Sequence, residues 1–243
     1  MKSTLRVVTY NVHKGVRGLG PRRRLEIHNL GYAIAQFGAD LICLQEVRAR
    51  HHHDARRFEH WPARPQADFL APRGYHAIYR SNAYTRHGEH GNALLSRWPV
   101  VAVQHEDMSD HRFEQRGLLH VLLDADGHPL HVVVLHLGLL AGGRRRQIAQ
   151  LDQYLRLAVP KDQRLIVAGD LNDWATQLHP ALTAMQLIAW QAGHHPTFPS
   201  RLPLVQLDYI YTRGLHPLKV RVPRGPSWWR MSDHLPLIAD FGW

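Results

Sequence analysis

Short apolar runs, several of them rich in Val, Ile and Tyr, recur along the whole chain and constrain its fold more than any other feature. Many are bounded by Gly, Pro, Asp or Asn, which is typical of strands that end in turns. The composition of Asp124–His128 predicts a hairpin loop between two of them. The predicted strands are Leu5–Tyr10, Leu41–Leu44, Tyr75–Tyr79, Ala93–Leu95, Val100–Val103, Leu118–Leu123, His131–Leu137, Leu165–Ala168, Leu207–Tyr211, Leu218–Val222 and Leu237–Phe241.

Helical periodicity is rarer along the chain. Apolar residues at helical spacing predict helices over Arg24–Phe37 and Gln147–Leu157, and a proline in a first turn predicts a third over Pro180–Leu187. Many strands with a few interspersed helices indicate α/β or α+β layers around one core. Since no repeat or shift in composition divides the 243 residues, we expect a single domain over residues 1–243.

The charge balance points to polyanionic partners. Lys and Arg number 30 against 20 Asp and Glu, giving a formal net charge of +10. Such a surface favours nucleic acid, phosphorylated small molecules or anionic lipid headgroups. The clusters Arg22–Arg24 and Arg144–Arg146 could neutralise backbone phosphates, or they could be solvated helix starts.

Cysteine content and hydropathy suggest the compartment. The single cysteine, Cys43, lies in an apolar stretch and is expected to be a buried thiol, so no intramolecular disulfide can form. The N-terminus lacks the apolar stretch and cleavage site of a signal peptide. No run approaches the roughly 18 apolar residues that span a membrane. We therefore expect a cytoplasmic monomer without a transmembrane segment.

Two stretches are predicted to be loose. Arg48–Arg57 contains three consecutive histidines among arginines, and it is interpreted as a solvated loop or the exposed start of a helix, with metal binding as the alternative. Ser81–Gly91 mixes charged residues with glycines and is interpreted as a mobile connection that could border a substrate groove.

Polar side chains follow the predicted strand Leu165–Ala168. The run ends in Gly169, Asp170, Leu171 and Asn172, and side chains two apart on an extended chain share a face. A carboxylate can orient or deprotonate a water, and a neutral amide can donate to a phosphoryl oxygen. The alternative is a polar turn, because Gly, Asp and Asn are common turn residues.

Comparable groups stand at the ends of other strands. Each could separately be a turn residue, an exposed carboxylate, a cap or a core histidine. Together, oxygen ligands from Glu46, Asp233 and Asn11 suit Mg²⁺ or Mn²⁺, and Asp208 could orient His234 or stabilise its charged form. The groups are Asn11, Gln45, Glu46, His136, Asp208, Ser232, Asp233 and His234.

Several motifs in order resemble the endonuclease/exonuclease/phosphatase superfamily, which includes pancreatic DNase, abasic-site endonucleases, inositol polyphosphate 5-phosphatases and neutral sphingomyelinases. The resemblance runs from residue 9 to residue 236. It implies a DNase-I-like four-layer α/β/β/α sandwich, with two mixed β-sheets packed face to face, helices outside, and one divalent-metal site at one end of the sheets. The motifs are Thr9-Tyr10-Asn11, Leu44-Gln45-Glu46-Val47, Gly91–Pro99, His136-Leu137, Gly169-Asp170-Leu171-Asn172, Leu207-Asp208-Tyr209-Ile210 and Ser232-Asp233-His234-Leu235-Pro236.

The resemblance also implies roles for individual residues. Glu46 is implied to be the principal metal ligand, supported by Asn11, while Asp233 helps to organise the metal. Asp170 is implied to orient or deprotonate the attacking water, Asn172 to contact a phosphoryl oxygen, and His136 to stand against the phosphate. Asp208 is implied to pair with His234, which binds or protonates the phosphoryl group. Asn92 and Arg116 match less diagnostic positions and are assigned phosphate contact.

These inferences predict hydrolysis of a phosphoester by in-line attack of water, with Mg²⁺ or Mn²⁺ as cofactor. The net charge favours nucleic acid as substrate, and Trp229 in Trp228-Trp229-Arg230 could stack on bases, although this segment could also pack in the core or face a lipid. The first alternative is a phosphatase or a sphingomyelinase-like phospholipase acting on a small molecule or lipid headgroup. The second is an inactive phosphate-binding module.

Overall fold

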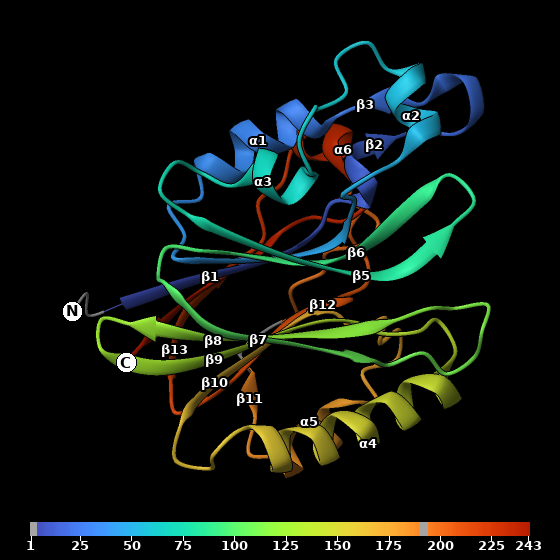
Figure 1. Cartoon of the computed structure of the whole chain (residues 1–243). Helices are drawn as coiled ribbons and strands as arrows, with labels where there is room; N and C mark the ends of the chain where they lie inside the picture. The colour runs from blue at the N-terminus through green and yellow to red at the C-terminus, as the bar shows by residue number, and fades with distance from the viewer. Residues whose placement is uncertain (1–3, 190–193) are drawn as a thin grey trace.

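The strands form two mixed sheets of six strands each, packed face to face (Figure 1). The structure is a computed structural model, which describes residues 4–189 and 194–243. In order across the first sheet, the strands are β13 (His216–Arg221), β14 (Leu237–Gly242), β1 (Thr4–Asn11), β4 (Leu41–Val47), β6 (Gly88–Ser96) and β5 (His76–Thr85). Across the second sheet they are β11 (Ile188–Ala189), β12 (Asp208–Arg213), β10 (Arg164–Asp170), β9 (His128–His136), β8 (Gly117–Ala125) and β7 (Val100–Asp107).

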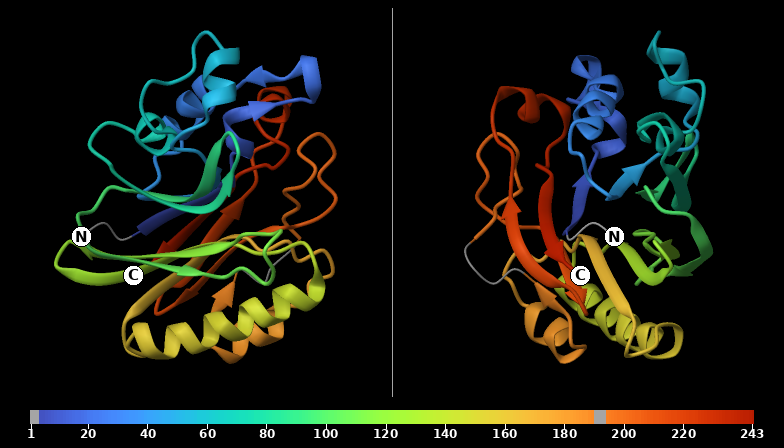
Figure 2. Two further views of the ribbon diagram at one scale, coloured as in Figure 1. Left: turned by 45° about the vertical axis from the view of Figure 1, so that its right-hand side comes forward. Right: turned by 90° about the vertical axis from the view of Figure 1, so that its left-hand side faces the viewer.

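Helices cover the outer face of each sheet, as the two views of Figure 2 also show. On the first sheet lie α1 (Ile27–Ala35), α3 (Gln66–Leu70) and α6 (Pro226–Met231), with α2 (His52–Arg57) and the short β2 (Val16–Arg17) and β3 (Arg24–Leu25) beyond them. On the second lie α4 (Ala141–Ala158) and α5 (His179–Ala184). Two 3₁₀ turns, η1 (His13–Gly15) and η2 (Gly20–Arg22), follow β1. The predicted α/β/β/α sandwich is confirmed.

Alternating side chains divide each central strand between two cores. In β1, Leu5 and Val7 enter the core between the sheets, whereas Val8 and Tyr10 pack toward α1 and α6. In β10, Ile166 and Ala168 enter the same central core, whereas Leu165 and Val167 face α4. This period of two fixes which face each later residue of a strand occupies.

The predicted strands all coincide with observed ones, while three local expectations needed correction. The first predicted helix begins only at Ile27, because Arg24 and Leu25 pair with β2. In Arg48–Arg57 the predicted exposed helix forms as α2, but Asp54 within it is fully buried between arginine side chains. Ser81–Gly91 is not a loose connection, because β5 and β6 stay paired out to Thr85 and Gly88.

Candidate functional site

Strand direction gathers the predicted polar groups at one end of the sandwich. β1 runs parallel to β4, and β9 runs parallel to β10, so the carboxyl ends of each pair lie side by side. The alternation that sends Ile166 and Ala168 into the central core also sends Asp170 there. In the register of the second sheet, Asp170 stands opposite His136 on β9 and Asp208 on β12.

Asp170 is the centre of the cluster. Its Oδ2 accepts a hydrogen bond from Asn11 Nδ2 at 3.1 Å and lies 3.5 Å from His136 Nε2 and 3.6 Å from His234 Nε2. Its Oδ1 accepts from the backbone N–H of Asn172 at 3.0 Å. One buried carboxylate thus contacts side chains from both sheets and from the segment before β14.

His234 is held by a second carboxylate. Its Nδ1 lies 2.8 Å from Asp208 Oδ2, which also accepts from the hydroxyl of Thr197 at 2.6 Å. Burial alone would lower the pKa of His234, but the charges of Asp208 and Asp170 outweigh it and raise that pKa to about 10. His234 is therefore an imidazolium at neutral pH, with its Nε2 toward Asp170.

His136, unlike His234, is neutral at neutral pH. Burial, followed by the positive charge of Arg116, lowers its pKa to about 4. Burial also raises the pKa of Asp170, against the opposing effects of His234 and His136. A carboxylate with a raised pKa is a stronger base at neutral pH, which suits proton transfer from a water.

Glu46 reaches the site by a break in strand regularity. Alternation along β4 would place Glu46 with Leu44, on the helix side of the sheet. A register shift between Leu44 and Val47 and a left-handed φ of 57° at Glu46 turn the side chain inward instead. Its Oε1 then lies 3.5 Å from Asn11 Nδ2.

Two basic residues contact the acidic groups of this half of the site. Lys14 Nζ lies 2.6 Å from Glu46 Oε2, and His13 Nδ1 lies 3.1 Å from Asp233 Oδ1. Burial would raise the pKa of Glu46, but Lys14 outweighs it and holds that pKa far below its usual range. Burial is likewise outweighed at Asp233, where His13 lowers the pKa to about 2.

Gly169 allows the close approach of the strands that carry His136 and Asp170. Its φ is +155°, and a Cβ built there would lie 1.9 Å from the carbonyl oxygen of Leu135. Asn172 follows with a left-handed φ of 48°, and its Nδ2 donates to Leu137 O at 2.9 Å. The segment directly after β10 is therefore held against the end of β9.

The remaining predicted residues lie outside this cluster. Asn92 is fully buried, and its Nδ2 donates to Gly117 O at 2.9 Å and Val134 O at 3.2 Å, so its amide links β6 to the second sheet. Arg116 lies closer, with its Nε donating to Leu137 O at 3.1 Å. Trp229 is half-buried on α6, and the neighbouring Trp228 stacks on Phe37 at 5.8 Å between ring centroids.

Sequence reasoning missed four residues that contact the site. They are His13, Lys14, Thr197 and Phe198, whose ring centroid lies 5.0 Å from that of His234. The only available signal for the first two was their position directly after the Asn11 motif. Nothing local indicated Thr197 and Phe198, because a separate segment carries them to Asp208 and His234.

Two groups of side chains are candidates for holding a metal. Asp170, Asp208 and His234 present donor atoms within 4.8 Å of one another, the one such group found among the described residues. The other is the predicted set of Glu46, Asp233 and Asn11. Nitrogens of Lys14 and His13 contact the carboxylates of Glu46 and Asp233 in this second set. These carboxylates therefore already interact with positive or hydrogen-bonding groups, as expected of a site that can hold a cation.

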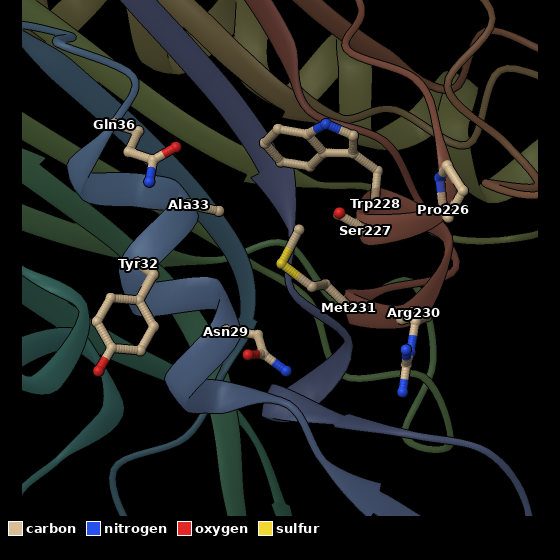
Figure 3. A pocket seen from close by; sticks show the side chains of 9 residues that line it. All are labelled: Asn29, Tyr32, Ala33, Gln36, Pro226, Ser227, Trp228, Arg230 and Met231. Carbon is tan, nitrogen blue, oxygen red and sulfur yellow. The ribbon is translucent and has the colours of Figure 1, made fainter.

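A separate hollow of about 650 Å³ lies on the outer face, between α1 and α6 (Figure 3). Tyr32 and Asn29 line it from α1, and Trp228, Arg230 and Met231 line it from α6. None of the predicted site residues lines it, although Met231 directly precedes Ser232. This hollow is therefore separate from the cluster of polar groups at the edge where the strands end.

Residues 8–234 match the endonuclease/exonuclease/phosphatase family. The chain belongs to this family. It is 34% identical over 245 residues to the uncharacterized protein YbhP of Escherichia coli, covering 98% of this chain and 96% of that protein. A shorter match, 25% identical over 109 residues, relates 39% of the chain to 19% of sphingomyelinase C from Leptospira interrogans.

A solved structure has the same fold. The endonuclease/exonuclease/phosphatase from Beutenbergia cavernae superposes with a TM-score of 0.78 at 20% identity, covering 99% of this chain and 72% of that one. Membership of this family identifies the chain as a phosphoester hydrolase, and the fold agrees with it.

Proposed function

We propose that this chain is a divalent-metal-dependent phosphodiesterase that hydrolyses its substrate by in-line attack of water at phosphorus. The observation that carries the proposal is the convergence of Asn11, His136, Asn172 and His234 on Asp170. One buried carboxylate with a raised pKa stands beside one neutral and one charged imidazole, which supplies a base and two donors in a single site.

The chemistry follows from the charge of each group. Asp170 accepts the proton of the attacking water. The His234 imidazolium, fixed by Asp208, donates to a phosphoryl oxygen as negative charge develops there, and Asn172 and His136 add neutral donors. Because its Nδ1 lies 2.8 Å from Asp208 Oδ2, His234 can keep its proton until the leaving oxygen needs one.

Glu46, Asn11 and Asp233 would hold the metal, for which Mg²⁺ or Mn²⁺ is the proposed ion. Their oxygen atoms match the ligand preference of a hard cation. We favour this set over Asp170, Asp208 and His234, because both ring nitrogens of His234 already face carboxylates, Nδ1 at 2.8 Å from Asp208 Oδ2 and Nε2 at 3.6 Å from Asp170 Oδ2. When bound, the metal supplies neutralisation of charge on the phosphoryl and leaving oxygens.

Two substrate classes are supported by different observations. The net charge of +10 supports nucleic acid, the substrate predicted from the sequence. A second candidate, a phospholipid, is supported by the apolar side chains that surround the site. Incubation with Mg²⁺ or Mn²⁺ and a panel of plasmid DNA, single-stranded DNA, RNA, phospholipid vesicles and bis(p-nitrophenyl) phosphate separates them.

The controls in that experiment are the Glu46→Ala, Asp170→Ala and His234→Ala variants. Each is expected to abolish metal-dependent hydrolysis and to leave the far-ultraviolet circular dichroism spectrum unchanged. Full activity of Glu46→Ala would refute the metal assignment. Absence of hydrolysis of every substrate by the unmodified protein would instead favour an inactive phosphate-binding module.

Three broader expectations belong to the same proposal. We propose that residues 1–243 act as one domain, that the protein is a monomer and that it is cytoplasmic. Among the described residues, no helix has both the length and the apolar character needed to cross a bilayer. Size-exclusion chromatography with light scattering tests the monomer, and fractionation of cells tests the location.

A further inference from the structure

Large apolar side chains are exposed preferentially at the catalytic end of the sandwich. Seven of the thirteen exposed large hydrophobic residues in the described part of the chain lie at this end, six on loops and Tyr84 near the end of β5. Single exposed leucines are ordinary, but a group of them around one opening marks an interaction surface. They form two lips, the first consisting of Tyr84, Phe113, Leu139 and Leu140 and the second of Trp174, Leu202 and Leu204.

The first lip borders a hollow of about 700 Å³. Its residues come from the β5–β6 hairpin, the β7–β8 loop and the start of α4, which lie together at the right-hand end of Figure 1. Their exposed fractions run from 58% to 81%. The inner wall of the hollow includes His90 and Arg116, and Arg116 lies beside the His136 strand.

The second lip lies on the other side of His234. The ring centroids of Phe198 and His234 lie 5.0 Å apart, and the Trp174 ring packs edge-on against Phe198 with 5.6 Å between ring centroids. Trp174 follows Asn172 by two residues, and its N–H donates to Asn172 O at 3.1 Å. Leu202 and Leu204 extend this lip from the segment before β12, the loop at the right of the first view in Figure 2.

Exposed arginines lie on these loops and near the start of α4. They are Arg86, Arg112, Arg145 and Arg201, and the Arg112 guanidinium lies 4.6 Å from the centre of the Phe113 ring. Apolar side chains that enter the acyl region, flanked by cations at the level of the headgroups, are the arrangement by which peripheral proteins bind anionic bilayers.

Several arginines of the two clusters that predicted nucleic-acid binding are paired with other groups of the protein. Arg23 makes two hydrogen bonds to Asp54, at 2.8 and 2.7 Å, and Arg146 is paired with Asp110. Arg144 is buried, with its Nη1 donating to Leu139 O at 2.5 Å. In addition, four of the seven lip residues are leucines, which lack the π-face on which bases stack.

We infer that the two lips dock the protein on an anionic phospholipid surface, with the catalytic site facing the headgroups. This surface is distinct from the residues that carry the chemistry. The inference rests on the proposed function in one respect: the substrate is a phospholipid only if the central site hydrolyses phosphodiesters.

Cosedimentation with vesicles tests the docking. The unmodified protein is compared with two double variants, Leu139→Ser/Leu140→Ser and Leu202→Ser/Leu204→Ser. The matched control is Leu157→Ser, because Leu157 is 83% exposed at the opposite end of the same 18-residue helix α4. Vesicles of phosphatidylcholine alone are compared with vesicles containing a quarter phosphatidylglycerol, and thermal unfolding verifies that every variant is folded.

We expect binding to the phosphatidylglycerol vesicles, weakened about tenfold or more by either double variant and unaffected in Leu157→Ser. Equal loss in Leu157→Ser, or no binding by the unmodified protein, would overturn the inference. A third result would also overturn it: the unmodified protein binds single-stranded DNA but not vesicles, and both double variants lose that DNA binding. Hydrolysis of bis(p-nitrophenyl) phosphate by the unmodified protein is measured in parallel, so failure of docking and failure of the proposed function are separate results.

Discussion

Two groups of buried histidines lie in the described part of the chain, and one histidine, His234, differs from the others in charge. His136 and His234 flank Asp170 at the proposed catalytic site. His120 and His131 lie on the face of the second sheet toward α4, joined by a 2.8 Å contact between His120 Nε2 and His131 Nδ1. The neutral Tyr154 and Gln163 side chains complete this second group, which we call the outer histidine cluster.

A neighbouring carboxylate, and not the degree of burial, accounts for the difference in charge between His234 and the other buried histidines. Burial lowers the pKa of His120 to about 4, and of His136 to about the same value. His234 is equally enclosed, yet its contact with Asp208 raises its pKa to about 10. The same side chain is therefore a neutral structural hydrogen-bonding group in one place and a charged donor in another.

The largest expected effect is the loss of the central base. Asp170→Asn keeps the shape of the side chain but removes the proton acceptor, so the rate of metal-dependent phosphodiester hydrolysis should fall by about 10²–10⁴-fold. Steady-state kinetics with bis(p-nitrophenyl) phosphate measures it, with His120→Gln as the matched variant of the outer histidine cluster. A fall of less than tenfold would place the base elsewhere.

The second effect removes the carboxylate that distinguishes His234. Asp208→Asn should move the alkaline limb of the pH–rate profile down by more than about one unit, because the imidazolium loses its stabilising partner. In the unmodified protein this limb should lie near pH 10. Rates across pH 6 to 11 check it, and an unmoved limb would show that His234 does not set it.

The same pair predicts how stability depends on pH. Because the folded pKa of His234 is raised above its ordinary value of 6.5, its contribution is complete below pH 6.5 and disappears as the pH rises through about 10. In Asp208→Asn this decline should be smaller. Urea unfolding of the metal-free proteins between these pH values measures both slopes.

A smaller effect concerns Lys14, which contacts the proposed metal ligand Glu46. Lys14→Met removes a cation that competes for the carboxylate, so the affinity for Mn²⁺ should rise about two- to fivefold, the scale of a partly exposed ion pair. Titration calorimetry measures this affinity, and the melting temperature in EDTA should fall. Weaker Mn²⁺ binding would instead mean that Lys14 orients Glu46 for the metal.

The smallest effect on activity is expected in the outer histidine cluster. His120→Leu should leave the rate within about twofold, because no catalytic group contacts this cluster, but it should lower the free energy of unfolding by about 1–3 kcal/mol through unpaired buried partners. Chemical denaturation and kinetics on one preparation test both parts. A large loss of activity would mean that the two clusters are coupled.

Alternation alone could predict much of the site. Asn11, Asp170 and His136 each continue the inward-facing positions of an apolar strand, so their common location follows from the sequence pattern. Glu46 does not, because only the bulge in β4 brings it inward. Its prediction as a metal ligand came from the chemistry of its carboxylate and from the resemblance to the family, and not from periodicity.

The parts that could not be predicted depend on distant contacts. Lys14 points at Glu46 because the left-handed turn is closed by Gly15, where a Cβ would meet Gln66 Nε2 at 2.8 Å. Asp54 stands among arginines and histidines and resembles a solvated residue, yet Arg23, 31 residues earlier, pairs with it in the interior. Local composition carries no information about such tertiary partners.

Four residues at the site have left-handed backbone conformations, namely His13, Lys14, Glu46 and Asn172. For a residue with a Cβ, this conformation costs about 1 kcal/mol or more relative to glycine. Substitution by glycine at these positions would therefore relieve strain in the same step that removes a functional group. A descendant chain freed from selection for catalysis has a thermodynamic reason to acquire glycine there, and glycines at these positions on an intact sandwich would identify a relative that has become a binding module.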